Sequence, residues 1–213
     1  MKPLRAALVL FFLVAPATAR CQEENQADGV TVSFMLGGSA SFPLSESFSD
    51  GWNTGFGGYL GLLAPVSSGF GFYIGAEYRS FGLDDDALKD EVYRIVPGTY
   101  SLEISGGSAN IIDVYATLAP IFVGAGSSTW GYLYAGGGAS NLAVTDATVK
   151  ATAESQSASG TIAGTDEWNA MILGGAGVVF DIVQLSGSVS HIFTEEGVTT
   201  ASVKVGVVLG GRK

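Results

Sequence analysis

Apolar residues stand at every second position in five short segments of the chain: 30–37, 72–79, 112–119, 185–190 and 202–209. A period of two predicts β-strands, because successive side chains of a strand point to opposite faces. Three further segments, 54–64, 131–141 and 167–180, alternate less cleanly but are rich in glycine, aromatic and aliphatic residues. The pattern therefore predicts eight strands.

The predicted connections between these strands alternate in length. Tight turns join strands two and three, four and five, and six and seven, at 65–69, 124–129 and 181–183. The other connections are long polar segments, with one of middling length at 194–199. Short turns on one side and long loops on the other are typical of transmembrane barrels. The sequence predicts an all-β fold, an eight-stranded antiparallel up-and-down transmembrane β-barrel.

Composition agrees with this fold class. Charged residues make up only 14% of the chain and hydrophobic residues 47%, whereas about 25% charge is usual in soluble proteins. The 31 glycines argue against long helices, because each glycine weakens a helix interior by about 1 kcal/mol.

The first nineteen residues have the pattern of a signal peptide. Lys2 and Arg5 precede an apolar run at 6–15, and Ala17-Thr18-Ala19 supplies a cleavage site. The run is shorter than the roughly 20 residues of a membrane span. We therefore expect a signal peptide over 1–19 and a barrel over 20–213, with strands between about 29 and 211. Lipidation at Cys21 is the alternative, but Thr18 and Arg20 do not fit a lipidation motif.

Charge limits the possible partners. Residues 1–19 carry two of the ten basic residues and no acidic one, so eight basic and twenty acidic residues remain, a net charge of −12. Nucleic acid phosphates would repel such a chain, and no nucleic-acid partner is expected. An exported chain without an apolar run long enough for a helical span can still cross a membrane as a closed barrel.

Several stretches resemble those of a known family. The segment 32–39 reads Val-Ser-Phe-Met-Leu-Gly-Gly-Ser, and 55–82 forms a hairpin pattern whose second strand carries an inward Glu. The stretches 132–138 and 174–177 add Tyr-then-Ala-Gly and Gly-x-x-Gly patterns. Over about 28–211 the chain resembles the small porin-like outer-membrane β-barrel domain of the OmpA/OmpX type. The resemblance implies outer-membrane lipid and the barrel assembly machinery as partners, and it brings no catalytic motif.

Barrels of this type usually end on an aromatic residue that belongs to the assembly signal. This sequence ends Gly-Gly-Arg-Lys, and a polar-x-Gly-apolar-x-apolar pattern lies slightly upstream. We take Lys204, Gly206, Val207 and Leu209 as the expected assembly signal.

Four charged residues fall on the predicted inward face: Glu77, Arg79, Asp113 and Lys204. They suggest either a functional role, as an ion path or a gate, or a structural network of lumenal salt bridges. The interior of an eight-stranded barrel is just filled by side chains, and unpaired buried charges cost several kcal/mol. We therefore favour the structural network.

Other candidate sites are weaker. His191, the sole histidine, falls in phase with outward residues and has no acid positioned on its face, so it is not assigned as a base. The acidic run Asp84-Asp85-Asp86 lacks the spacing of a calcium loop, and no metal or cofactor is expected. Around Pro97-Gly98, the runs 92–96 and 99–104 predict a projecting hairpin, and 145–165 predicts a second ribbon or partial disorder.

Aromatic residues near the predicted strand ends suggest interfacial girdles. We expect Trp52, Phe56, Phe81, Trp168 and Phe193 at the long-loop rim, and Phe70, Trp130 and Phe180 at the short-turn rim. The sequence favours a non-enzymatic outer-membrane barrel that displays acidic extracellular loops in a surface or structural role. A narrow porin is the alternative, and an enzyme at the membrane face is the second alternative.

Overall fold

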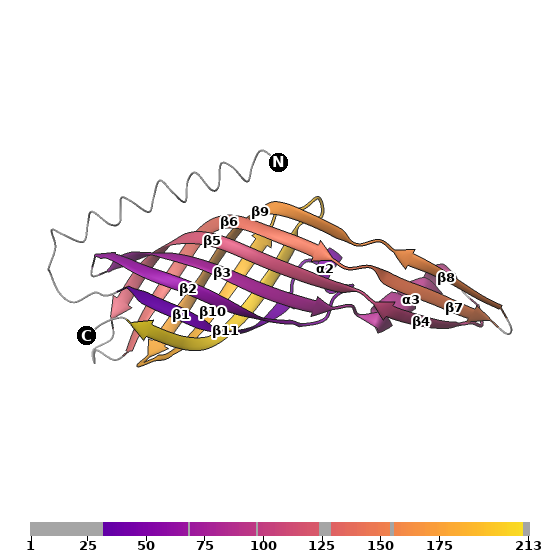
Figure 1. The fold of residues 1–213 in the computed structure, drawn as a ribbon, viewed down its shortest axis with the longest axis horizontal. Coiled ribbons are helices and arrows are strands. Elements are labelled where there is room, and N and C mark those ends of the chain that lie inside the picture. The colour runs from indigo at the N-terminus through magenta and orange to yellow at the C-terminus, as the bar shows by residue number, and fades with distance from the viewer. Residues whose placement is uncertain (1–31, 68, 97, 124–128, 154–155, 211–213) are drawn as a thin grey trace.

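The computed structural model describes residues 32–67, 69–96, 98–123, 129–153 and 156–210. The expected signal peptide and Cys21 lie outside these residues. Eight strands close into one barrel, in the order β1-β11-β10-β9-β6-β5-β3-β2 (Figure 1). Their bounds are β1 Ser33–Pro43, β2 Gly55–Ser67, β3 Phe70–Gly82, β5 Ser108–Val123, β6 Thr129–Val144, β9 Thr165–Phe180, β10 Val183–Ile192 and β11 Val198–Gly210.

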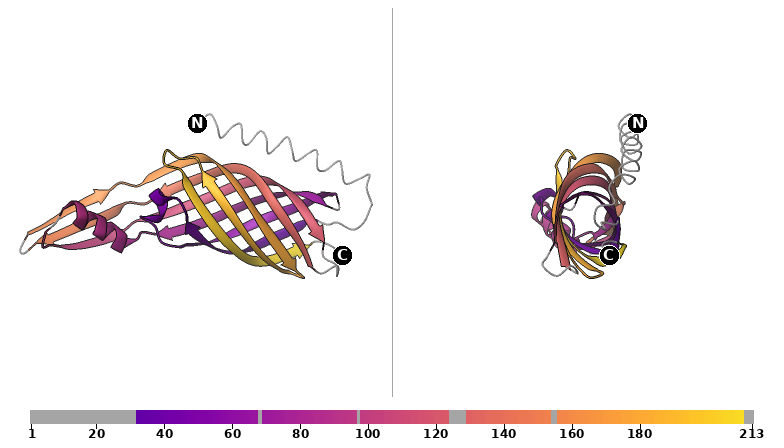
Figure 2. Two further views of the ribbon diagram at one scale, coloured as in Figure 1. Left: turned by 180° about the vertical axis from the view of Figure 1, so that it is seen from behind. Right: turned by 90° about the vertical axis from the view of Figure 1, so that its left-hand side faces the viewer.

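All neighbouring barrel strands pair antiparallel, and the first and last strands close the ring. The β1–β11 register runs from Ser33 opposite Gly210 to Pro43 opposite Thr200. The right-hand view of Figure 2 shows the ring of strands end on. The eight-stranded antiparallel barrel predicted from the sequence is confirmed.

Side chains alternate between the two faces of the wall as the five regular segments predicted. On β3, Tyr73, Glu77 and Arg79 are buried inside the barrel, while Tyr78 is exposed outside. On β11, Val203 and Val205 are exposed outside. The period of two in the sequence therefore separates a polar lumen from an apolar outer wall.

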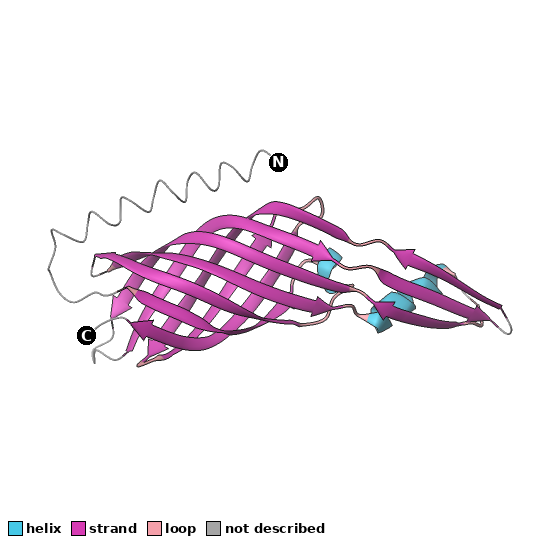
Figure 3. Cartoon of the chain, viewed as in Figure 1, coloured by secondary structure: helices cyan, strands magenta, loops and turns pink. Residues whose placement is uncertain are grey.

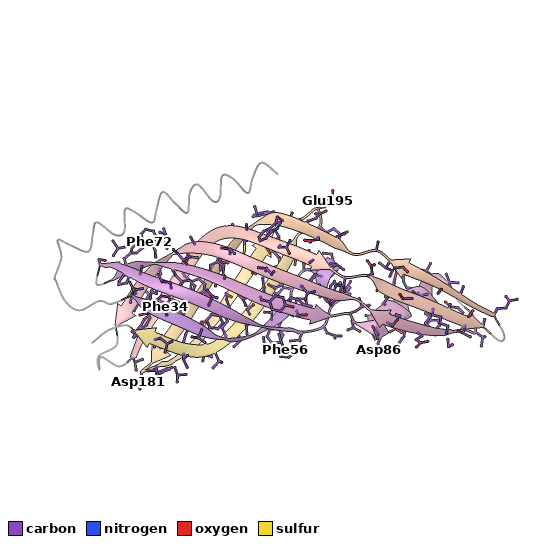
Figure 4. The ribbon with its side chains drawn as sticks, in the orientation of Figure 1. Phe34, Phe56, Phe72, Asp86, Asp181 and Glu195 are labelled. Carbon is purple, nitrogen blue, oxygen red and sulfur yellow. The ribbon has the colours of Figure 1, made fainter. Side chains whose placement is uncertain are left out.

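Connections at the two ends differ in length. The β9–β10 turn at 181–182 and the β2–β3 turn are tight, and Asp181 takes a positive φ of 57° in the first of them. The connections at the opposite end are longer and carry the elements outside the barrel. We call these the short-turn end and the long-loop end; Figure 4 labels Asp181 at the first and Glu195 at the second.

Three strands form a second sheet beyond the long-loop end (Figure 3). It has the order β4-β7-β8, with bounds β4 Ser101–Gly106, β7 Ala147–Ala153 and β8 Gln156–Ile162. We call it the projecting sheet. Its strands prolong the barrel strands β5, β6 and β9, and of the two alternatives left open for 145–165 the described residues form the ribbon.

The hairpin predicted around Pro97-Gly98 is wrong. Residues 92–95 of the first run lie in a helix, α3 Asp85–Ile95, and residues 101–104 of the second run lie in β4, which pairs with β7 instead. The Asp84 side chain caps the helix by accepting a hydrogen bond from the Ala87 amide at 3.1 Å. In the last turn, Arg94 donates to Glu91 at 2.8 Å, and this hydrogen bond lowers the pKa of Glu91. Helix capping thus outweighs the β-propensity of Val92 and Ile95.

A single helical turn, α2 Glu46–Ser49, belongs to the first long loop. Its Phe48 is buried, and its ring meets Phe81 edge on with ring centroids 5.2 Å apart. In the described part of the chain, no helix has the length and apolar character needed to cross a membrane.

Candidate functional site

Two ion pairs lie inside the barrel. Arg79 of β3 pairs with Asp113 of β5, and Lys204 Nζ of β11 lies 2.6 Å from Glu77 Oε2 of β3. All four side chains are at most 4% exposed. The structure therefore brings together the four inward charges expected from the sequence, and we call them the lumenal network.

The lumenal network connects walls that are not neighbours in the sheet. Going round the barrel, β1 and β2 separate β11 from β3, so the Lys204–Glu77 pair crosses the lumen. Arg79 also donates to Thr200 of β11 and, at 3.4 Å, to Ser190 of β10. These contacts link opposite walls, and they fill the lumen at this level.

Pairing also resolves a repulsion between neighbouring strands. Glu77 and Asp113 stand directly opposite each other in the β3–β5 register, where like charges are destabilising. Each carboxylate instead takes a separate cation, so the network has two positive and two negative groups. Because a buried charge without a partner costs several kcal/mol, removing one member should be far worse than removing a pair.

A layer of tyrosines fills the lumen on the short-turn side of the network. Its members are Tyr59, Tyr73, Tyr115, Tyr132 and Tyr134. The Tyr73 ring centroid lies between 5.5 and 6.2 Å from those of Tyr115, Tyr132 and Tyr134. Gln184 joins the layer, since it accepts from Tyr59 at 2.8 Å and donates to Tyr132. The sequence indicated only the inward phase of Tyr73 and Tyr115; the layer as a unit was not predicted.

The tyrosine layer contacts the network through a cation. Lys204 Nζ lies 5.6 Å from the ring centroid of Tyr59 and 5.7 Å from that of Tyr115. At these distances an ammonium is attracted by the negative ring faces. The network and the tyrosine layer are therefore one packed polar core.

Glycines on neighbouring strands make room for these rings. Gly75 stands opposite Tyr115 in the β3–β5 register, and Gly177 stands opposite Tyr132 in the β6–β9 register. A Cβ at Gly75 would lie 2.6 Å from the Tyr115 ring, and one at Gly177 would lie 2.5 Å from the Tyr132 ring. Real Cβ contacts are longer, so a larger residue at either position would displace a ring.

An apolar layer lies on the long-loop side of the network. Phe81, Ile111, Ile192 and Val198 point inward there and are buried. Phe48 from α2 packs onto Phe81 and covers this layer at the long-loop end. The described side chains therefore occupy the lumen on both sides of the charges.

The outer wall has the opposite character. Large apolar side chains are exposed all round the barrel; examples are Phe34, Leu36, Leu60, Val114, Leu118, Leu133, Ile172, Leu185, Val189, Val203 and Val205. Figure 4 labels Phe34, Phe56 and Phe72 on the outside of the barrel. Soluble monomers rarely expose a contiguous apolar surface of this kind, which suits contact with lipid.

Solved structures of similar outline include those of three bacterial proteins. Ail of Yersinia pestis has a TM-score of 0.48 at 13% identity, covering 86% of this chain and 100% of its own. The N-terminal β-barrel domain of OprF from Pseudomonas aeruginosa has 0.45 at 12%, covering 84% and 99%. Neisserial surface protein A has 0.44 at 12%, covering 85% and 99%.

The strand order and registers of this chain decide its fold. It is a small, closed, eight-stranded antiparallel β-barrel. Neither a protein-family model nor a curated protein matches the sequence.

The remaining candidates lie outside the lumenal core. His191 faces outward at the long-loop end of the barrel, where its Nδ1 lies 2.8 Å from Thr199 Oγ1 and its ring meets Phe193 edge on. The acidic residues of α3 join no group of three or more potential metal ligands among the described residues.

The expected assembly signal and aromatic girdles fall on both faces of the wall. Lys204 belongs to the lumenal network, whereas Val207 and Leu209 are exposed outside. Phe56, Trp168, Phe193 and Phe180 are exposed near strand ends as expected, but Phe81 is buried inside and Trp130 packs against Tyr132. Their phase in the strands points these two rings inward.

Proposed function

We propose that this barrel is an integral outer-membrane protein that displays acidic loops at the cell surface and has a structural or surface role without catalysis. The observation that carries the proposal is the reversed polarity of the fold. The wall is apolar where a soluble barrel would be polar, and four charges are paired inside. A closed barrel satisfies all its backbone hydrogen bonds, as hydrocarbon surroundings require.

Orientation follows from the loops. In barrels of this type the long loops face the outside and both chain ends face the periplasm. Acidic side chains predominate at the long-loop end; they include Glu46, Asp50, Asp85, Asp86, Asp90, Glu91, Glu103, Asp146, Asp166, Glu167, Glu195 and Glu196. The proposed surface is therefore strongly negative at the long-loop end, both at the rim and on α3 beyond it.

Export and assembly complete the proposal. The signal peptide pattern over 1–19 supports export, and the pattern ending at Leu209 supports recognition by the barrel assembly machinery. That pattern lies on β11, which closes the barrel against β1. Catalysis is not proposed, because the hydrogen bond of His191 goes to a threonine hydroxyl and not to a carboxylate that would orient a base.

Fractionation and tag accessibility test the proposal. The protein should sediment with the outer membrane and migrate faster on a gel before heating than after it. An epitope inserted after Glu195 should be accessible to antibody on intact cells, and one inserted after Asp181 should be accessible only after permeabilisation. A soluble protein, or the reverse accessibility, would contradict the proposal.

A narrow porin is the second candidate. The observation that favours it is a set of buried polar atoms without a hydrogen-bond partner in the described protein, among them Glu77 Oε1, Asp113 Oδ1 and Ser140 Oγ. Groups of this kind commonly bind internal water, which could open a thin aqueous path. Planar bilayer recordings distinguish the two functions, because steady single-channel steps support the porin and a silent bilayer containing folded protein supports the filled barrel.

A further inference from the structure

Strand β8 forms one edge of the projecting sheet. It pairs with β7 along all seven of its residues, from Gln156 to Ile162, and all seven are exposed. In the described chain, no strand pairs with its other edge. Its outward backbone amides and carbonyls are therefore available for pairing with another strand.

This edge lacks the features that usually protect an edge strand. Natural edges carry charges, proline or bulges that prevent pairing with other chains. β8 reads Gln-Ser-Ala-Ser-Gly-Thr-Ile, and its register with β7 runs without a shift. The opposite edge, β4, carries Glu103 and ends at Gly106 with a φ of 78°. The uncharged β8 edge therefore presents fewer barriers to a partner strand than the β4 edge does.

Charge does not oppose the approach of a second copy at this sheet. The three strands of the sheet contain one acidic and one basic residue, Glu103 and Lys150, which stand directly opposite each other in the β4–β7 register. The rim below is acidic, so two copies would repel each other there. The strands of the projecting sheet carry no net charge, so this is the part of the surface where charge opposes contact least.

β8 is complementary to itself in one full-length register. Antiparallel pairing about a two-fold axis at Ser159 places Gln156 opposite Ile162, Ser157 opposite Thr161 and Ala158 opposite Gly160. All seven residues then find a partner, and only uncharged side chains meet. The result is one six-stranded sheet, which a self-complementary two-fold contact closes without further growth.

The same symmetry fixes how the two barrels are oriented. The two-fold axis of an antiparallel edge pair stands perpendicular to the strands. The strands of the projecting sheet run along the barrel axis (Figures 1 and 2). The two barrels must therefore point in opposite directions, with their long-loop ends facing each other.

We propose that β8 is a self-docking edge through which copies of this protein in two facing membranes pair. The proposal rests on the proposed function, because it requires the long-loop end to face outward. Two copies in one membrane cannot form this pair. Their barrels would point the same way, so the two-fold axis relating them would run along the strands. Each backbone amide of one β8 would then lie opposite the same amide of the other and not opposite a carbonyl. The occupant of the edge is thus β8 of a copy on another membrane.

Vesicle clustering tests the pairing. The purified protein is reconstituted into phosphatidylcholine vesicles, and two populations with different lipid dyes are mixed. Turbidity and the coincidence of the two dyes are then followed. Wild-type protein should cluster the vesicles, and vesicles without protein should stay separate.

Charge exchange identifies the contact. In the proposed register Ser157 of one copy faces Thr161 of the other. Replacing both residues by glutamate therefore gives two repulsive pairs across the contact, and replacing both by lysine does the same. Each variant alone should cluster at least about tenfold more slowly, and a mixture of glutamate and lysine vesicles should cluster again. The matched control places the same charges at Thr148 and Thr152, which share this sheet face but lie on the central strand β7. The control should cluster like wild type.

The outcomes separate the two proposals. Heat modifiability and protease protection show on every sample whether the barrel is inserted. Inserted wild-type barrels that do not cluster, or charged variants that cluster like wild type, would overturn the β8 pairing and leave the proposed function intact. Cross-linked pairs within single vesicles without clustering would also overturn it. Failure to insert would overturn the proposed function itself.

Discussion

Arg79 makes more side-chain hydrogen bonds than any of the other three charges of the lumenal network, so its replacement is the sharpest perturbation of the core. Its guanidinium pairs with Asp113 and donates to Thr200 and Ser190. Arg79→Met keeps much of the volume but leaves the Asp113 carboxylate buried without its cation. Breaking a fully buried pair costs about 3–5 kcal/mol. We expect a loss of that size in the free energy of unfolding.

The companion variant removes both charges. Arg79→Met with Asp113→Leu leaves no unpaired ion, and replacing a buried pair by apolar side chains is often neutral or stabilising. We therefore expect the double variant to recover most of the loss. The assay is urea unfolding of the folded barrel in detergent micelles, followed by tryptophan fluorescence and by the heat-modifiability gel.

An exposed ion pair provides the control. Lys89 Nζ lies 3.6 Å from Asp86 Oδ1 on the surface of α3, and such pairs contribute about 0–1 kcal/mol. Lys89→Met should therefore change stability little. The reasoning is refuted if Arg79→Met costs no more than this control, or if the double variant loses as much as the single one.

Three further changes test the other layers. Val205→Arg places a charge on the lipid-facing wall and should lower the free energy of unfolding of the barrel by about 2–4 kcal/mol. Unfolding in lipid vesicles measures this loss, and no loss would mean that this face is not in lipid. Gly75→Val forces a side chain into the Tyr115 ring. Overpacking of this kind should lower the free energy of unfolding in urea by about 1–3 kcal/mol, and an unchanged value would contradict the tight packing of the tyrosine layer. Phe48→Ala removes the ring that packs on Phe81 and should speed protease cleavage in the first long loop while the barrel remains heat-modifiable; unchanged cleavage would show that Phe48 does not anchor the loop.

The strand pattern could be predicted from the sequence because the barrel wall is only one layer thick. Each strand faces lipid on one side and the lumen on the other, so alternation records both environments directly. The segment 202–209 shows this, since Val203 and Val205 are exposed outside while Ser202 and Lys204 are buried inside. In the segments 131–141 and 167–180 glycines occupy both faces, so the sequence did not indicate which residues point into the lumen.

The elements beyond the barrel were predicted less well. The run 92–96 has high β-propensity, but three aspartates before it supply a helix cap and favourable charge at the first turn. The capping signal was present in the sequence, but the acidic run was interpreted as a solvated loop without the spacing of a calcium site. β4 then pairs with a strand some fifty residues away, a contact that no local pattern specifies.

The lumenal site was predicted by residue but not by partner. The inward phase identified all four charges, yet Lys204 reaches Glu77 across the lumen from a strand that is not its neighbour. Such a pair depends on the closure of the barrel and on the glycines that admit the tyrosine rings. Distances across a closed lumen follow from the three-dimensional fold and cannot be read from spacing along the chain.

A nitroxide scan along β11 tests the central account most directly. Single cysteines are introduced at each position from 199 to 209 in a Cys21→Ser background, labelled, and reconstituted into lipid bilayers. Accessibility to lipid-dissolved oxygen should alternate, high at Val203, Val205 and Val207 and low at Ser202 and Lys204, with a water-soluble nickel reagent excluded from the outward positions. A scan in which the nickel reagent reaches Val203, Val205 and Val207 freely, or in which oxygen shows no period of two, would contradict the membrane-spanning barrel.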